Sequence, residues 1–366
     1  MKKKILLIPL VLLLAISLVA VGCAKPAPTP APAPPPAPAP APAPTPAPAP
    51  APAPTTWRWA TLQSPQNPVI VHLQEGFDAV TEQTEGRLKF RGYYGTESGF
   101  DAKEYIHMLE EGLMDAAFAA TSTSAFEYPW LGVFGIPYIA PDINEREYLL
   151  AALRPMLDEF CKEHGIIPLA YPLHWDTYLV LYSTRNIQSL ADSEGMLIRV
   201  YDPNSSAAAE GLGGTPVFLQ KSEVYLGLQK GTIDGAMTGT TSAEALHFDE
   251  VCEHEMKLWT LFAPNIVGVS KIAWDKISPD DQLIVRNVMS EWEASYWDVI
   301  NDPEVQATAF DYAISHGMNV FDAPPDVKEV FVKVRDFAIE NFLEESGAKG
   351  EEALEKMKGA LAELGY

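Results

Sequence analysis

One arginine at the end of a short apolar stretch has clear potential to bind a small molecule. Arg199 lies in "MLIRV", residues 196–200, which has the pattern of a short buried strand. A planar guanidinium can hold a carboxylate through two parallel hydrogen bonds, a geometry that a lysine cannot offer. From the residues alone Arg199 could also form a surface ion pair, so the interpretation depends on the elements around it.

Side chains near the ends of other predicted strands extend the candidate site. Trp175, Tyr178 and Tyr201 could form an apolar or aromatic wall, although each is as suited to the core as to a pocket. Thr121 and Thr238 belong to the polar stretches "ATSTS" (120–124) and "MTGTTS" (237–242). We expect both stretches to line a ligand cleft.

Signals for catalysis or metal binding are weak. The sequence contains neither G-x-S-x-G nor H-E-x-x-H. The segment "HFDEVCEHEM" (247–256) groups His247, Asp249, Cys252 and His254. On a helix, however, histidines seven residues apart lie about 10.5 Å apart along the axis, too far to share one ion. We interpret 247–256 as a solvated acidic helix and expect no metal, no cofactor and no enzymatic activity.

An internal similarity indicates how the chain is organised. The segment "LEEGLMDAAFAATST" (109–123) returns as "LQKGTIDGAMTGTTS" (228–242), and an E-G-x-L stretch precedes each, at 85–88 and 194–197. In both halves a helix ends at glycine and an aspartate opens the next strand, although glycine and aspartate can punctuate any such turn. Helices between strands predict parallel pairing, and ligands of such sheets lie beyond the carboxyl ends of the strands. The repeat therefore favours two similar α/β lobes with a cleft between them.

The predicted fold is α/β, with two lobes, a cleft between them and one long helix. We assign residues 57–176 and 266–303 to the first lobe, and residues 177–265 and 304–366 to the second. The long helix begins with Ser278 as N-cap and Pro279 at its first position, and Pro303 should bend or end it.

The first 56 residues do not belong to either lobe. Residues 1–22 combine three lysines with an apolar run and end in Val21-Gly22-Cys23, which resembles a bacterial lipoprotein signal; a retained transmembrane anchor is the alternative. Residues 23–56 then hold the lipidated Cys23 and an Ala-Pro tether, which favours an extended polyproline conformation of about 3.1 Å per residue. The body is expected outside the cytoplasm, in the periplasm or at the cell surface.

The charge of the chain restricts its partners. Its formal net charge is −23, and removing the signal with its three lysines makes the charge −26. Such an acidic surface excludes nucleic acid as a partner. Cys161 and Cys252 could form one disulfide or remain two buried thiols.

Residues 190–239 resemble the solute-binding proteins of tripartite ATP-independent periplasmic (TRAP) transporters. The matching positions are Leu197-Ile198-Arg199-Val200, Gly214-Thr215-Pro216-Val217, Ser222-Glu223-Val224-Tyr225, Leu228-Gln229 and Gly231 to Gly235, with weaker similarity over 57–340. We expect a monomer, and the resemblance implies a two-lobed periplasmic-binding-protein fold in which the long helix is the hinge. It implies a receptor that closes on a small organic acid and passes it to a membrane permease. It also implies that Arg199 grips the ligand carboxylate.

The sequence departs from the family pattern at several ligand positions. The stretch "HWDTYLVLY" (174–182) lacks a second arginine, and Ala236-Met237-Thr238 stands where an acid and an amide are usual. Lys221 replaces a frequent phenylalanine. It is a further candidate ligand residue, although an orientation toward solvent is favoured over a role as second anchor. These departures indicate one firmly held carboxylate beside an apolar or aromatic remainder.

Other functions remain open at this stage. The chain could be the receptor of another importer or of a signalling sensor, and less readily a secreted hydrolase. A neighbouring TRAP permease gene would favour transport, whereas a neighbouring histidine-kinase gene would favour sensing.

The lipid anchor gives a first testable prediction. Replacing Cys23 by serine removes the thiol that would be acylated, so the variant should lose its lipid and remain uncleaved or be processed elsewhere. Mass spectrometry of the N-terminus from the native membrane fraction checks this, with the wild-type protein as reference. An unacylated N-terminus on the wild-type protein would contradict the assignment.

Overall fold

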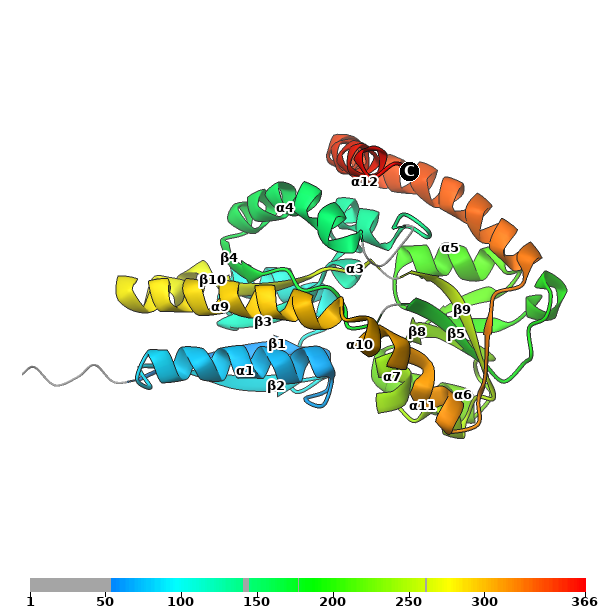
Figure 1. Cartoon of the computed structure of the whole chain (residues 1–366), viewed down its shortest axis with the longest axis horizontal. Coiled ribbons are helices and arrows are strands. Elements are labelled where there is room, and N and C mark those ends of the chain that lie inside the picture. The colour runs from blue at the N-terminus through cyan, green and yellow to red at the C-terminus, as the bar shows by residue number, and fades with distance from the viewer. Residues whose placement is uncertain (1–53, 141–144, 177, 261) are drawn as a thin grey trace, which may run out of the picture. The chain divides into compact units, whose positions relative to one another are not determined.

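A computed structural model describes residues 54–140, 145–176, 178–260 and 262–366; the side chains of residues 306 and 307 lie outside this description. The predicted signal 1–22 and the tether up to residue 53, including Cys23, therefore lie outside the described residues. Two mixed β-sheets with helices packed on their faces make up the described part (Figure 1). The first strand begins at Thr55, inside the segment that we assigned to the tether.

The first lobe is built on a five-stranded sheet in the order β2-β1-β3-β10-β4. Its strands are β1 (Thr55–Thr61), β2 (Leu88–Tyr94), β3 (Ala116–Ala120), β4 (Ile166–Ala170) and β10 (Asn265–Ser270). Its helices are α1 (Pro68–Gln83), η1 (Ala102–Glu104), α2 (Tyr105–Glu110), α3 (Thr121–Ser124), η2 (Pro129–Gly135), α4 (Arg146–Glu163), α8 (Lys271–Trp274) and α9 (Pro279–Ile300). Large aromatic side chains such as Trp57, Trp59 and Phe77 fill its core.

The second lobe is built on a six-stranded sheet in the order β11-β9-β5-β8-β6-β7. Its strands are β5 (Tyr178–Ser183), β6 (Leu197–Val200), β7 (Thr215–Phe218), β8 (Gly235–Gly239), β9 (His254–Thr260) and β11 (Asn319–Asp322). Its helices are η3 (Leu190–Ser193), α5 (Pro203–Gly211), η4 (Lys221–Glu223), α6 (Val224–Gln229), α7 (Thr240–Ala245), η5 (Phe248–Glu250), α10 (Pro303–Ala307), η6 (Thr308–Phe310) and α11 (Asp311–Ser315). Alternate residues of β5 enter two different cores, one on each face of the sheet. Both faces are therefore covered.

The prediction of parallel pairing holds for only part of each sheet. Strands β1, β2 and β3 are parallel, as are β6, β7 and β8. By contrast, β10 runs antiparallel to β3 and β4, and β5 runs antiparallel to β8 and β9. The antiparallel strands β5 and β10 both follow a crossing of the chain from the other lobe, which a local helix–strand pattern does not reveal.

The internal repeat corresponds to the same structure in each lobe. Gly112 and Gly231 both adopt positive φ angles, 67° and 66°, after a helix of six residues. The backbone N–H of Arg58 in β1 donates to Asp115 Oδ2 over 2.9 Å, and that of Leu197 in β6 donates to Asp234 Oδ2 over 2.8 Å. Each aspartate thus ties the start of one strand to its parallel neighbour.

Two crossings between the lobes lie side by side. The segment that joins β4 to β5 pairs with the segment that joins β9 to β10: His174 N donates to Ala263 O over 2.9 Å, and Asn265 N donates to Pro172 O over 2.8 Å. Tyr296 of α9 donates its hydroxyl to Leu173 O over 2.6 Å. The crossing segments are therefore held to each other and to α9.

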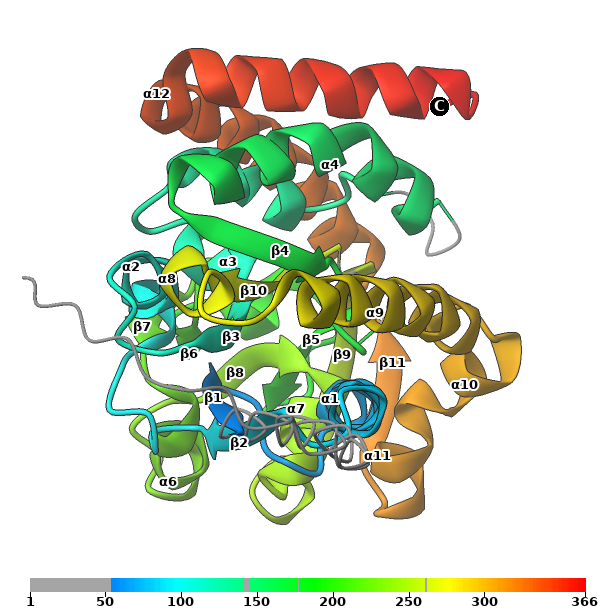
Figure 2. The same ribbon diagram turned by 90° about the vertical axis from the view of Figure 1, so that its left-hand side faces the viewer.

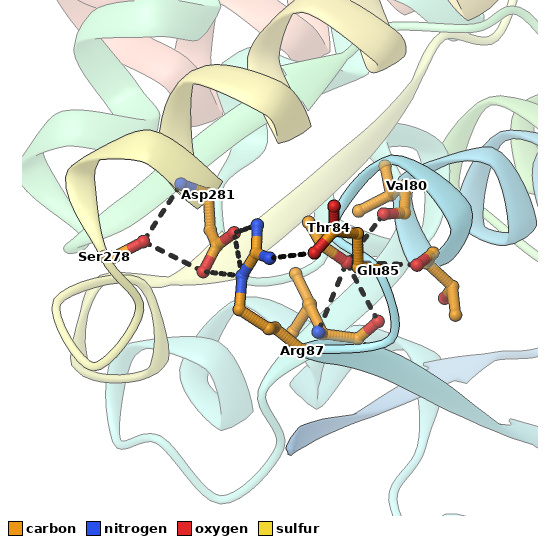
Figure 3. Close-up of polar contacts among 8 residues, drawn as sticks. Val80, Thr84, Glu85, Arg87, Ser278 and Asp281 are labelled. Atoms are coloured by element: carbon orange, nitrogen blue, oxygen red, sulfur yellow. Dashed lines mark hydrogen bonds and ion pairs between the residues drawn. The ribbon is translucent and has the colours of Figure 1, made fainter. Parts of the chain in front are cut away.

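Helix α9 starts and ends as predicted. Ser278 accepts from Asp281 N and caps the helix, which ends at Ile300 before α10 begins at Pro303. Figure 2 shows α9 between α1 and β4, and both pack against it. At its first turn Asp281 is bound by Arg87, the residue before β2, through Nε at 3.1 Å and Nη2 at 2.9 Å (Figure 3). The helix body thus packs on the first lobe, and α10 continues into the second.

The last helix, α12 (Pro325–Glu363), contacts both lobes. Its first half contributes Val327 and Phe331 to a core of the second lobe. Its second half, beyond a kink at Gly347, contributes Leu354 and Met357 to the core of the first lobe and packs on α4. This packing differs from our assignment of 304–366 to the second lobe alone.

Two further expectations can be compared with the structure. The segment 247–256 is not the acidic helix that we predicted, because only η5 is helical and His254 already opens β9. Cys161 and Cys252 are free, buried thiols in different cores. Among the described helices, none combines the length and apolar character needed to cross a membrane.

The cap of α9 gives a stability prediction. Asp281 is 6% exposed, and although burial would raise the pKa of its carboxyl, hydrogen bonds from Arg87 and Ser278 lower it. Replacing Asp281 by alanine should reduce the free energy of unfolding by about 1–2 kcal/mol, measured by urea denaturation at pH 7. The neighbouring Asp280 is exposed, so Asp280→Ala is the matched control and should change it by less than about 0.5 kcal/mol. Equal losses of unfolding free energy in both variants would show that the contact of Asp281 with Arg87 does not stabilise the fold.

Candidate functional site

A cavity of about 320 Å³ lies between the two lobes. It opens at the carboxyl ends of β1 and β3 on one side and of β6, β7 and β8 on the other, where open α/β sheets usually bind ligands. The lining residues on which the site depends are Gln63, Ser122, Thr123, His174, Asp176, Arg199, Tyr201, Lys221 and Thr238. We call it the interlobe cavity.

Four of the seven residues predicted from the sequence line this cavity: Arg199, Tyr201, Lys221 and Thr238. The other three do not. Thr121 is fully buried and donates its hydroxyl to Pro264 O over 2.7 Å, while the adjacent Ser122 and Thr123 reach the cavity. Trp175 packs against Tyr296 and lines a second cavity of about 300 Å³, and Tyr178 packs on Phe310. The stretch 120–124 therefore reaches the cavity through Ser122 and Thr123 rather than through Thr121, and of the three predicted wall aromatics Tyr201 lies at the cavity whereas Trp175 and Tyr178 do not.

Arg199 is fixed by the ends of neighbouring strands. Its Nε donates to Leu219 O over 3.2 Å, and its Nη1 donates to Met237 O over 3.0 Å. The guanidinium also lies over the ring of Tyr201, 5.4 Å from its centroid. Burial lowers the pKa of Arg199 to about 10, which leaves it charged at neutral pH.

Within the described ranges, the charge of Arg199 has no partner of opposite sign in direct contact. Among the residues that the structure describes, no carboxylate lies within 4.0 Å of the guanidinium. The nearby Asp202 is engaged as the N-cap of α5, where its Oδ1 accepts from Ser205 N over 2.6 Å. A buried cation that faces a cavity in this way can bind an anion with little rearrangement.

Lys221 lines the cavity, so the expectation that it points to solvent was wrong. It belongs to η4 of the second lobe, and its Nζ donates across the cavity to Gln63 Oε1 of the first lobe over 2.9 Å. Burial lowers the pKa of Lys221 to about 8; the charge of Asp176 opposes this shift and that of Arg199 adds to it. Arg199 and Lys221 therefore both bring positive charge to the cavity wall, which the exposed Lys103 also lines.

The sequence analysis missed a polar chain that begins at Lys221. Gln63 Nε2 lies 3.1 Å from His174 Nε2, and His174 Nδ1 lies 2.9 Å from Asp176 Oδ2. With the Gln63 amide nitrogen as donor, Nε2 accepts and the imidazole proton is on Nδ1, facing the carboxylate. Ammonium, amide, imidazole and carboxylate thus form one oriented chain, assembled from both lobes and a crossing segment.

Asp176 is fully engaged by this chain and by α7. Its Oδ1 accepts from Thr241 N over 2.6 Å and from Thr240 Oγ1 over 3.0 Å, and its Oδ2 accepts from Thr241 Oγ1 over 3.0 Å. Burial would raise the pKa of Asp176, but hydrogen bonds from His174 and Thr241 lower it. The carboxylate is therefore ionised and positions the crossing segment. The signal for it was the "HWD" sequence at 174–176, next to the aromatic residues that we selected.

Two phenylalanines from different lobes close one side of the cavity. Phe126 and Phe218 meet edge to face with ring centroids 5.6 Å apart, and they are 45% and 55% exposed. Gln220 Nε2 donates to Asp101 Oδ1 nearby, over 3.3 Å. The lobes therefore contact each other around the cavity through both aromatic and polar side chains.

Comparison with known proteins identifies the family. Residues 60–346 match the family described as bacterial extracellular solute-binding protein, family 7. The chain belongs to this family. The match agrees with the resemblance to TRAP solute-binding proteins seen in residues 190–239.

Two relatives whose names state the solute that they bind are similar to this chain at low sequence identity. The sialic acid-binding periplasmic protein SiaP of Vibrio cholerae is 23% identical over 253 residues, which are 66% of this chain and 75% of that protein. The 2,3-diketo-L-gulonate-binding periplasmic protein YiaO of Escherichia coli is 25% identical over 209 residues, 56% of this chain and 62% of that protein.

Solved structures of extracytoplasmic solute receptors confirm the predicted fold class. DctP7 of Bordetella pertussis, an extracytoplasmic solute receptor binding pyroglutamic acid, superimposes with a TM-score of 0.75 at 20% identity over 83% of this chain and 99% of its own. A TRAP periplasmic solute-binding protein of Chromohalobacter salexigens, with bound D-glucuronate, superimposes with a TM-score of 0.73 at 21% identity. The match covers 83% of this chain and 99% of that protein. At this identity the likeness shows a shared two-lobed fold.

The engagement of Asp176 gives a pH-dependent prediction. Because its pKa in the folded protein is lowered below the unfolded value of about 3.9, its stabilisation is present above that pH and is lost as the pH falls further. Replacing Asp176 by asparagine should cost about 2 kcal/mol of unfolding free energy at pH 7, and the difference from wild type should shrink below pH 4.

Urea denaturation at pH 7, 5 and 3.5 measures this effect. Asp275→Asn is the control, because the ion pair of Asp275 with Lys271 is exposed on both sides and should contribute less than about 0.5 kcal/mol. A loss for Asp176→Asn that stays constant from pH 7 to 3.5 would show that the ionised carboxylate is not the stabilising form.

Proposed function

We propose that the protein captures a small organic carboxylate in the interlobe cavity and delivers it to a TRAP-type membrane permease. The observation that carries this proposal is the buried guanidinium of Arg199, which faces the cavity without a carboxylate in contact among the described residues. Two parallel N–H···O bonds from a guanidinium are well suited to a ligand carboxylate.

The second group of contacts in the cavity suits an oxygen-rich ligand. Thr238, Ser122 and Thr123 bring hydroxyl groups to its wall, and Tyr201 supports the arginine. The ligands named for related structures, pyroglutamate, D-galacturonate, D-glucuronate and L-gulonate, all combine one carboxylate with further oxygen atoms. We infer a ligand of this chemical type for this chain.

The cellular setting of the proposal follows from the N-terminal sequence. A lipid on Cys23 and the Ala-Pro tether would hold a monomeric receptor body near the outer face of the membrane, within reach of its permease. Ligand capture would close the lobes around the crossing segments, since a ligand that contacts both lobes favours the closed arrangement. Family membership supports binding and transport rather than catalysis.

Substitution of Arg199 tests the proposal. A thermal-shift screen with pyroglutamate, D-galacturonate, D-glucuronate, L-gulonate and simple mono- and dicarboxylates first finds a binding acid, since ligand at 100 times its Kd adds about 2.7 kcal/mol of stability. Arg199→Ala should then weaken binding of that acid by about 30- to 5,000-fold, measured by calorimetry. Arg199→Lys should recover only part of the affinity, because a point charge lacks the two-pronged geometry.

A second arginine of the same lobe provides the matched control. Arg185 forms a surface ion pair with Asp234 and is 44% exposed, so Arg185→Ala should change affinity less than twofold. If Arg199→Ala folds normally and its affinity for the acid falls less than fivefold, other residues hold the ligand carboxylate. A response to neutral sugars alone, with no acid binding, would overturn the carboxylate assignment.

A further inference from the structure

The second cavity, of about 300 Å³, has the opposite charge to the interlobe cavity. Among the described residues, the charged groups in its wall are all carboxyls: Glu244 of α7, Asp249 of η5 and Glu255 of β9. Pro68 at the start of α1 and Ile300 at the end of α9 also line it, so the wall includes residues of both lobes. An acid of the kind that suits Arg199 would be repelled here.

Glu255 is the buried carboxyl of this wall, and its oxygens are unpaired. Its residue is 0% exposed, and within the part of the chain that the structure describes neither carboxyl oxygen has a hydrogen-bond partner. The Tyr182 hydroxyl is near enough to favour the ionised carboxyl but makes no hydrogen bond to it. Lys257 Nζ lies over the ring of Phe310 instead, 4.1 Å from its centroid. A buried carboxyl without a partner is costly, so Glu255 is an acceptor available to a bound cation.

Aromatic rings make up much of the remaining wall. They belong to Trp175, Tyr182, Phe248 and Tyr312, and the rings of Tyr182 and Phe248 pack edge to face with centroids 5.4 Å apart. The faces of such rings attract cations, and aromatic walls are typical of sites for alkylammonium groups. A metal ion would need several acidic or imidazole ligands in one cluster, and the described residues contain no such cluster. The wall therefore suits an organic cation.

We propose that the second cavity binds a small alkylammonium cation, with Glu255 as its counter-ion and the aromatic rings as its walls. The volume of about 300 Å³ lies at the lower end of small-molecule sites, which suits a cation with few heavy atoms. This site is separate from the interlobe cavity. Thr240 and Thr241 of α7 line the second cavity and donate to Asp176, which lines the other one.

Calorimetry with choline and its neutral isostere 3,3-dimethylbutan-1-ol tests the inference. The two molecules have nearly the same shape and differ in charge, so the comparison isolates the cation. At equal ionic strength, choline should bind about tenfold or more tightly than the alcohol, and tetramethylammonium should compete with choline. Equal affinity for choline and the alcohol, or no binding of either cation, would overturn the inference. Displacement of choline by calcium at the same ionic strength would indicate a metal site and also overturn it.

Three substitutions locate the bound cation. Glu255→Gln keeps the shape of the side chain and removes its charge, so choline affinity should fall about tenfold or more. Ala309→Leu enlarges a side chain of the cavity wall without changing charge and should also weaken choline binding. Glu253→Gln is the matched control, because Glu253 is exposed and lies outside the wall, and it should change affinity less than about twofold.

Choline binding should also depend on pH through Glu255. The titratable and charged groups that face this carboxyl are Tyr182 of β5, Lys257 of β9 and Asp176 of the crossing segment, with Glu244, Asp249 and Tyr312 across the cavity. Burial raises the pKa of Glu255 to about 7, so the carboxyl is mostly ionised at pH 8 and mostly protonated at pH 6. Choline keeps its charge throughout, so its affinity should fall about tenfold from pH 8 to pH 6 in the wild-type protein and stay constant in Glu255→Gln.

The outcomes separate this inference from the proposed function. Thermal unfolding verifies that each variant is folded, and if Glu255→Gln does not fold, Ala309→Leu and the wild-type pH profile decide. Choline binding that survives the substitution in a folded variant, or that does not change with pH, would place the cation outside the second cavity and overturn the inference. Arg199→Ala should leave choline affinity within about twofold, because Arg199 does not line this cavity. Loss of acid binding in that variant concerns the interlobe cavity alone.

Discussion

The buried positive charge of Arg199 is the constraint on which the rest of the site depends. Removing a guanidinium from water costs several kcal/mol, and here the compensation comes from two backbone carbonyls, those of Leu219 and Met237, and from the face of Tyr201. Carbonyl groups at strand ends can stabilise the guanidinium in this way only if adjacent strands keep a fixed register. The position of the Arg199 guanidinium is therefore determined by strand register.

The repeated aspartates supply that register. Asp234 binds Leu197 N at the start of β6, and Arg199, two residues further along the same strand, donates to Met237 O of the adjacent β8. Asp115 makes the equivalent bond to Arg58 N in the first lobe, whose parallel strands β1 and β3 end at the other side of the cavity. Sequence similarity between the two halves thus reflects a shared means of aligning strand ends around the cleft.

Local patterns in the sequence were sufficient to predict the features that depend on neighbouring residues along the chain. The helix–glycine–aspartate–strand units, the cap of α9 at Ser278 and the position of Arg199 at a strand end are of this kind. The polar chain depends instead on residues that are distant in the sequence, because Lys221 and Gln63 are 158 residues apart and meet only when the lobes come together. For the same reason the antiparallel strands β5 and β10, which follow crossings between lobes, were not foreseen.

The acidic body makes the arrangement of charge inside the cavity decisive. With a formal net charge of −23, the protein cannot attract an anion from a distance, and beyond about 8 Å salt screens most of its field. Asp176 would repel an anionic ligand if its carboxylate were free, but Thr240, Thr241 and His174 satisfy it. The carboxylate of Asp176 is therefore engaged by protein donors, while the buried Arg199 and the half-buried Lys221 both line the cavity. Attraction for an anion arises only within the closed space between the lobes, where the low effective dielectric strengthens it.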